Sequence, residues 1–263
     1  MSFTGKSPAD TYKDITYLDN NNSGVDSTVR SIKTGNGADT SLSVSDRALK
    51  VKSSTNNTTA LDVQNSSGTS KLLVDTTNNL VKALGTHVNT QYAYFGADNT
   101  HTASYDANTH YPIPFATNTT SSNTTQDNVN FSTGTDPATT FTTADGAGTH
   151  AGELVPFLWF VPDGISIDSV TSIEGADDGD GDTTRMHLYS YTFTSGSTSC
   201  LTAGTLLAHN SDVTNAGSEQ AYKTTWTVDS ASVDADKVIL GFFRSDSVNS
   251  DYSINITVKY HLT

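Results

Sequence analysis

The chain has 263 residues, of which 34% are hydrophobic and only 16% charged, and its formal net charge is −14. Nearly all the acidic residues are aspartate, which disfavours helices and settles in turns, so the acidity itself indicates a loop-rich β protein. An anionic surface disfavours binding to nucleic acid or to an anionic membrane. The longest apolar run is far too short to cross a bilayer, so we expect no membrane insertion.

Residues 1–85 are predicted to form short strands between polar turns, with too few apolar residues to close a core. The alternating runs cover residues 42–44, 49–51, 61–63, 72–74 and 80–81. Residues 60–75 predict a hairpin with a glycine turn at Gly68. An isolated hairpin is marginal in water, so we expect this segment to pack around a three-fold axis as a stem. A flexible linker is the alternative, and the regular alternation favours the ordered stem.

Residues 86–263 carry nearly all the aromatic residues and the longer strand-like runs. Those runs are residues 154–161, 165–173, 184–194, 205–208, 220–228, 237–244 and 251–261. Residues 251–261 alternate strictly, which predicts a strand with one buried and one wet face, whereas residues 238–243 are apolar on both faces and predict the middle of a sheet. The predicted fold class is all-β, with a thin N-terminal stem (1–85) and a C-terminal antiparallel, jelly-roll-like β-sandwich (86–263).

Aromatic anchors and loops complete this prediction. Residues 111–115 contain two prolines and predict an extended or edge segment, and residues 117–150 predict loops anchored by Phe131 and Phe141. Trp159 and Trp226 both lie in apolar or alternating runs. We therefore expect both tryptophans in the core, or Trp159 at a subunit contact, and assign neither to a ligand.

Asp178, Asp180 and Asp182 alternate with glycines directly after Asp177, and this is the sharpest local motif. Glycines permit a tight bend in which carboxylates can wrap a hard cation such as calcium. The motif is no EF-hand, because the position that needs a bidentate glutamate is Tyr189. An acidic, solvated hairpin turn is the alternative that we favour. The sequence suggests no metal or cofactor other than calcium at these three aspartates.

No pattern in the sequence indicates catalysis. The seven histidines include no His-x-His pair, and the chain has no G-x-S-x-G motif and no glycine-rich phosphate loop. Cys200 is the only cysteine and has no neighbouring histidine in sequence. We therefore predict that the protein is not an enzyme. No secretory signal pattern is present, which favours assembly inside a cell.

Both ends of the chain resemble known virion proteins. Residues 5–8, 11–15, 19–20, 24–26, 35–37 and 68–79 are similar to N-terminal segments of fibre and decoration proteins of tailed bacteriophages, especially marine phages. Residues 250–261 look like the last strand of the trimeric jelly-roll heads on such proteins. These stretches cover roughly a third of the chain, and a shared fold does not by itself fix function.

The resemblance implies a homotrimeric structural protein on the virion surface, assembled in the host cytoplasm, and it carries no catalytic residues. Its N-terminal segment would dock on capsid or tail proteins, and host-surface glycans are candidate ligands of the C-terminal domain. We favour a capsid decoration or head fibre, because the chain is short and lacks a long repetitive shaft. A short tail fibre or receptor-binding protein of the same class, and a carbohydrate-binding module or adhesin outside a virus, are the alternatives. A polysaccharide-degrading tailspike fits less well.

Overall fold

The computed structural model describes residues 15–21, 23–97, 106–115, 130–131, 139–143, 150–176, 181–216, 220–246 and 252–263. These ranges contain antiparallel strands, one short 3-10 turn and no α-helix, so the predicted all-β class is confirmed. None of them forms a helix that could span a bilayer. Contacts divide the chain into an N-terminal unit, Met1–Val88, and a C-terminal unit, Asn89–Thr263.

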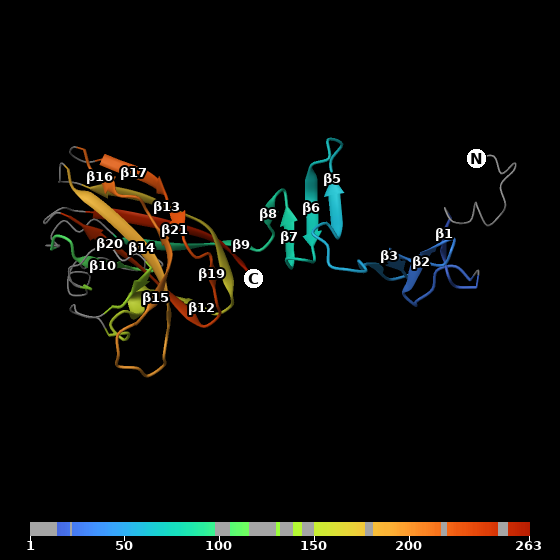
Figure 1. Cartoon of the computed structure of the whole chain (residues 1–263), viewed down its shortest axis with the longest axis horizontal. Helices are drawn as coiled ribbons and strands as arrows, with labels where there is room; N and C mark the ends of the chain where they lie inside the picture. Colours follow the sequence, from blue (N-terminus) through green and yellow to red (C-terminus); the bar gives the residue numbers. More distant parts are fainter. Residues whose placement is uncertain are drawn as a thin grey trace. The chain divides into compact units, whose positions relative to one another are not determined.

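The N-terminal unit contains two four-stranded antiparallel sheets, each with its strands in chain order (Figure 1). The first sheet comprises β1 (Thr16–Leu18), β2 (Arg30–Thr34), β3 (Asp39–Val44) and β4 (Leu49–Val51). The second comprises β5 (Leu61–Gln64), β6 (Ser70–Asp75), β7 (Leu80–Ala83) and β8 (Thr86–His87). The hairpin predicted over residues 60–75 is confirmed as β5–β6, and Gly68 in its turn takes the left-handed conformation, with φ 79°.

The C-terminal unit is built from an eight-stranded and a five-stranded antiparallel sheet. The eight-stranded sheet has the order β10 (His110–Ile113), β20 (Lys237–Ser245), β14 (Thr183–Thr192), β15 (Gly204–His209) and β11 (Thr140–Phe141), with β12 (Leu158–Val161), β16 (Val213–Thr214) and β18 (Thr227–Val228) paired alongside. The five-stranded sheet has the order β17 (Gln220–Thr225), β13 (Ile165–Ala176), β21 (Tyr252–Leu262) and β9 (Thr90–Ala97), with β19 (Ser232–Val233) paired to β13. Each of the two sheets therefore provides an extended surface that can bury apolar side chains.

The first hydrophobic cluster, called the inter-sheet core, draws side chains from both sheets. It includes Phe95 on β9, Val170 on β13, Leu188 on β14 and Ile256 on β21. Along β21 buried and exposed residues alternate, as the sequence predicts for residues 251–261. Trp159 and Trp226 belong to this core, which confirms their predicted burial.

A second cluster, called the outer core, lies against the other face of the eight-stranded sheet. It contains Tyr189, Tyr191 and Phe242 from the sheet, and Phe131 and Leu154 from the connecting segments. Strand β20 is consequently buried on both faces and has strand partners on both sides, which confirms the prediction for residues 238–243.

The predicted edge segment and the two predicted loop anchors are also confirmed. Residues 110–113 form β10 at one end of the eight-stranded order. Phe131 is buried in the outer core, and Phe141 packs against it. Most of the tract 117–150 lies outside the described residues.

Two predicted strands differ from the structure. Residues 154–161 begin with a 3-10 turn, Val155–Phe157, because Pro156 cannot donate a ladder hydrogen bond, and the strand itself starts at Leu158. The run 220–228 is divided between the two sheets: β17 pairs with β13, whereas β18 pairs with β15. The chain changes sheets at Trp226, whose indole Nε1 donates a 2.9 Å hydrogen bond to Ser172 Oγ.

Strand β13 contains a bulge that decides which side chains point inward. Its pairing with β21 runs regularly to Ile167, skips Asp168 and resumes at Ser169. Before the bulge Ile165 and Ile167 are buried, and after it Val170, Ser172 and Glu174 are buried instead. The bulge therefore turns Glu174 into the protein interior and leaves the neighbouring Ile173 56% exposed.

Candidate functional site

The N-terminal unit presents apolar side chains that no part of its own described chain buries. In the second sheet, cross-strand pairing places six of them on one face: Leu61, Val63, Leu72, Val74, Val81 and Ala83. We call this set the stem face. None of the six is buried, and Val63 is 48% exposed. This face is therefore available to a partner.

The first sheet repeats the arrangement on a smaller scale. The directly opposed pairs Leu42–Val51 and Val44–Leu49 share one face of β3 and β4. Leu49 is 70% exposed, although a solitary small sheet gains its stability from burying such a face. Among the described residues of the N-terminal unit, Asp75 alone is buried. The two sheets of one chain thus lack a core of their own.

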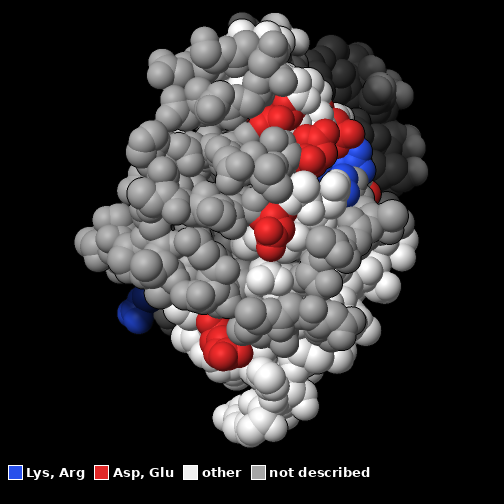
Figure 2. All heavy atoms as spheres, turned by 90° about the vertical axis from the view of Figure 1, so that its left-hand side faces the viewer, with Lys and Arg blue, Asp and Glu red and all other residues white. Residues whose placement is uncertain are grey.

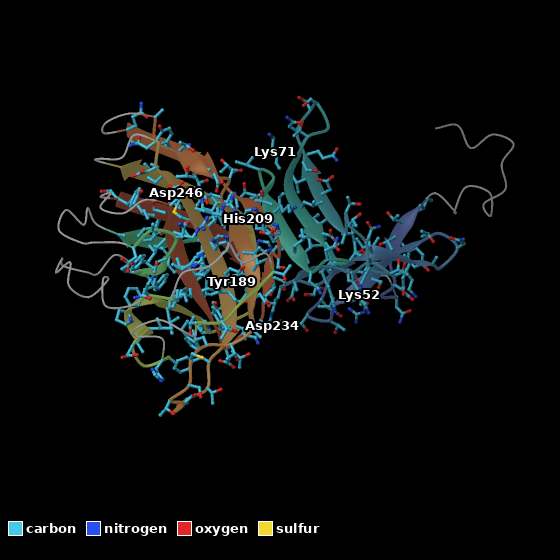
Figure 3. All side chains as sticks on the ribbon, turned by 60° about the vertical axis from the view of Figure 1, so that its left-hand side comes forward. Lys52, Lys71, Tyr189, His209, Asp234 and Asp246 are labelled. Atoms are coloured by element: carbon cyan, nitrogen blue, oxygen red, sulfur yellow. The ribbon has the colours of Figure 1, made fainter. Side chains whose placement is uncertain are left out.

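In the C-terminal unit, a pocket of about 660 Å³ opens beside β14, β15 and the loop that joins them. Its lining is rich in hydroxyl groups, contributed by Ser190, Thr192, Thr194, Ser197, Ser199, Thr202, Thr205 and Ser232. Asp234 and Lys237 are the charged residues of the lining, and Lys237 Nζ donates a 2.8 Å hydrogen bond to Thr192 Oγ1. Asp234 is labelled in Figure 3.

Tyr191 extends from β14 into the outer core and also lines this pocket. Its ring packs over Gly204, where an added Cβ would overlap the ring atoms. The hydroxyl is buried and has no hydrogen-bond partner among the described residues, and burial raises the pKa of Tyr191 well above its ordinary value.

The chemistry of this pocket suits a polar ligand with many hydroxyl groups. Serine and threonine hydroxyls can both donate and accept, and a carboxylate and an ammonium group add one fixed charge of each sign. Cys200 lines the pocket and is partly buried, and the described lining residues include no histidine. The described lining residues are thus mainly hydroxyl groups that can form hydrogen bonds with a ligand.

A much smaller cavity, about 10 Å³, lies where the inter-sheet core ends. It is lined by Glu174, Gly175, Asp182, Thr184, Val213, Asn215, Tyr222 and Tyr252. Thr184 Oγ1 of β14 donates a 3.0 Å hydrogen bond to Glu174 Oε2 of β13, which links the two sheets. Asp246, labelled in Figure 3, marks the same end of β20 and accepts a 2.7 Å hydrogen bond from the Thr183 amide.

Glu174 is only 4% exposed, and burial raises its pKa to about 7 even though hydrogen bonds from Thr184 and Thr224 favour the charged form. Its Oε1 atom has no hydrogen-bond partner among the described residues. The structure thus places a carboxylate, with one oxygen unsatisfied, against a small cavity between two sheets.

Of the predicted metal ligands, Asp182 is described and lines this cavity, whereas Asp178 and Asp180 lie outside the described residues. Sequence reasoning missed Glu174 and Tyr191. One signal for Glu174 was available, because it is one of only three glutamates in an aspartate-rich chain. No local pattern indicates Tyr191, since its role depends on the loop that returns to Gly204.

Two histidines lie close together on the outer face of the eight-stranded sheet. His187 on β14 and His209 on β15 are directly opposed, with ring centroids 6.3 Å apart, and His209 is labelled in Figure 3. Burial, followed by the positive charge of neighbouring groups, lowers the pKa of His187 to about 3. His209 Nδ1 lies 2.8 Å from Asp229 Oδ2. Because its pKa is lowered to about 3, His187 is neutral near pH 7, as is usual for a histidine in a protein core.

The charged side chains that Figure 2 shows on the C-terminal unit are mainly acidic, in keeping with the net charge of −14. No model of a known protein family matches the chain, and no curated protein matches it significantly.

Proposed function

We propose that the protein is a non-enzymatic structural component of a tailed-phage virion, a homotrimeric capsid decoration or head fibre displayed on the particle surface. The observation that supports this most is the stem face of the N-terminal unit. Two ordered sheets with no buried apolar residue among their described positions are stable only when other chains cover them. Three copies around a common axis would bury this face without leaving an open edge.

The proposed head is a jelly roll, and the order of its strands supports that assignment. A jelly roll folds eight strands into two four-stranded sheets through two Greek keys. Taken in chain order, β9, β10, β13, β14, β15, β17, β20 and β21 provide eight such strands, with first beside last in β9–β21 and second beside seventh in β10–β20. The remaining neighbours, β21–β13–β17 and β20–β14–β15, follow the same plan.

The proposed anchor is the N-terminal unit, which would dock on capsid or tail proteins and project the head outward. The resemblance of its sequence to fibre and decoration proteins is the support for this location. The acidic surface of the head disfavours nucleic acid as a partner.

Light scattering on the full-length protein tests the trimer. We expect a mass of three chains of 27.9 kDa each, unchanged over a wide range of protein concentration. A well-folded protein with the mass of one chain would overturn the proposal, because the stem face would then remain open to water.

The hydroxyl-lined pocket supports a second candidate, a carbohydrate-binding module or the receptor-binding head of a short tail fibre. Both would use the pocket to hold a host-surface glycan. A glycan array with the wild-type protein and with Ser190→Trp, which would fill the pocket, tests this candidate. Loss of a glycan signal in the variant alone would favour it, and absence of any signal from the trimer would favour a purely structural head.

A further inference from the structure

We propose that Glu174, Asp182 and Asn215 bind a calcium ion in the cavity at the end of the inter-sheet core. The site is separate from the proposed stem and from the hydroxyl-lined pocket. The calcium proposal depends on the geometry of the C-terminal unit alone. Its test is therefore independent of the proposed virion function.

The lining of the cavity consists of groups that a hard cation prefers. Glu174 and Asp182 bring carboxylates, Asn215 brings an amide oxygen and Thr184 brings a hydroxyl. Calcium takes six to eight oxygen ligands and accepts irregular geometry, so side-chain and backbone oxygens can combine around it. The described lining includes no lysine or arginine, and its other titratable groups are the phenols of Tyr222 and Tyr252. Glu174 thus has no basic side chain among the described lining residues to neutralise it.

The environment of the Glu174 side chain also supports a cation in this cavity. The side chain is 4% exposed, it lines the cavity, and Oε1 has no hydrogen-bond partner in the described chain, whereas Oε2 is held by Thr184. A buried carboxylate oxygen without a partner is costly, and either a proton or a cation would remove that cost. The raised pKa of Glu174, about 7, reflects the same imbalance in the metal-free protein.

Backbone hydrogen bonds hold the other two ligands next to each other. The Asn215 amide donates to the Asp182 carbonyl at 2.8 Å, and the Gly181 amide donates to the Asn215 carbonyl at 2.7 Å. Asn215 itself is buried, with 3% of its surface exposed. The cavity volume of about 10 Å³ is close to the least that one water molecule requires, so the space fits a single small ion or a single water.

Terbium luminescence on the full-length protein provides the direct test. Terbium replaces calcium at oxygen sites, and the Tyr222 and Tyr252 rings in the lining would transfer excitation energy to it. We expect tyrosine-excited terbium emission that added calcium displaces. Glu174→Gln keeps the size of the side chain and removes its charge, and it should weaken terbium binding by about tenfold or more.

A double variant, Asp178→Asn with Asp180→Asn, is the matched control. It removes two charges from the neighbouring acidic segment and leaves Glu174, Asp182 and Asn215 in place. We expect its terbium affinity to stay within about twofold of wild type. Loss of binding in this control, with Glu174→Gln unaffected, would overturn the proposal and place the ion on the acidic segment instead.

Thermal unfolding of the wild-type protein, with calcium and with a chelator, tests the site without relying on a variant that must fold. Calcium should raise the unfolding midpoint of the wild-type protein at pH 8 relative to a chelator, because it binds the native state alone. The midpoint of Glu174→Gln should not respond to calcium. Equal midpoints of the wild-type protein in calcium and in chelator would overturn the proposal, with water then the occupant of the cavity.

Discussion

Three polar side chains, Glu174, His187 and Tyr191, are buried on β13 and β14, which follow one another in the chain and belong to different sheets. Burial shifts the pKa of each group toward its neutral form, upward for Glu174 and Tyr191 and downward for His187. His187 and Tyr191 are therefore neutral near pH 7, whereas Glu174 is partly ionised there. The stability of the unit then depends on pH through these few groups.

Gly204→Ala should destabilise the C-terminal unit by about 1–3 kcal/mol, because the new Cβ would overlap the Tyr191 ring and force one of the two aside. Urea unfolding followed by tryptophan fluorescence measures the effect. Gly152→Ala is the matched control, since nothing lies within 4 Å of the position of its Cβ. Equal losses in the two variants would show that the Tyr191 contact is unimportant.

His187 should make the native state less stable as the pH falls from about 6.5 to about 3, by up to roughly 5 kcal/mol. In this window the unfolded chain binds a proton at His187 and the folded chain does not, so acid favours unfolding. His187→Gln removes the contribution. The difference in unfolding free energy between wild type and this variant, measured at pH 4.5 and at pH 7, isolates it from Glu174, whose raised pKa acts in the opposite direction.

If that difference between the two proteins were the same at both pH values, His187 would be solvated in the native state. Its neighbours argue otherwise, because His110, His209, Arg185 and Arg244 all disfavour a further positive charge there.

At the scale of elements, the stem face predicts how the N-terminal unit assembles. Leu72→Asp would place a charge among the paired apolar residues of β5, β6 and β7, and we expect it to convert trimers into smaller species. Lys71→Asp is the matched control, because Lys71 is the preceding residue of the same strand, points to the opposite face and is also exposed. Light scattering on both variants measures the outcome. Dissociation by Lys71→Asp alone would assign the interface to the other face of the sheet.

The sequence allowed the strands to be predicted wherever alternation was local and regular. Strand β21 was predicted from the alternation of apolar and polar residues that begins at Tyr252. Strand β20 was predicted from an apolar run of the kind found in strands that are buried on both faces. The division of residues 220–228 could not be predicted, because alternation does not record which sheet a strand joins. The hydrogen bond from Trp226 to Ser172, 54 residues away, marks where the chain changes sheets.

The candidate sites were predicted less well than the fold. The aspartates were visible as a motif, but the Glu174 cavity combines residues from β13, from β14 and from the segment after β16. Tyr191 likewise depends on a loop that closes back on β14 through Gly204. Such long-range combinations arise from strand pairing, and a one-dimensional pattern does not contain them.

At the scale of the whole molecule, the two units differ in how they can be stabilised. The C-terminal unit buries two clusters of apolar side chains, whereas the described part of the N-terminal unit buries only Asp75. Under the proposed function, the head would fold by itself and the stem would need further copies of the chain.

Residues 1–88, produced alone and kept dilute, should therefore be unfolded, whereas residues 89–263 should fold cooperatively. Circular dichroism with sedimentation measures both properties. A folded, monomeric fragment 1–88 would contradict the intertwined stem, and it would leave the exposure of the stem face unexplained.

The bulge at Asp168 changes which residues of β13 point inward: the buried positions are odd-numbered before it and even-numbered after it. Deleting Asp168 would remove the bulge and leave Glu174 inward and Ile173 outward, because Ile167 and Ser169 already pair with consecutive residues of β21. The shortened protein would therefore keep Glu174 buried and lose only the local kink of the strand. In hereditary terms, a bulge of this kind lets one codon be gained or lost within a strand without exchanging the faces of the residues beyond it.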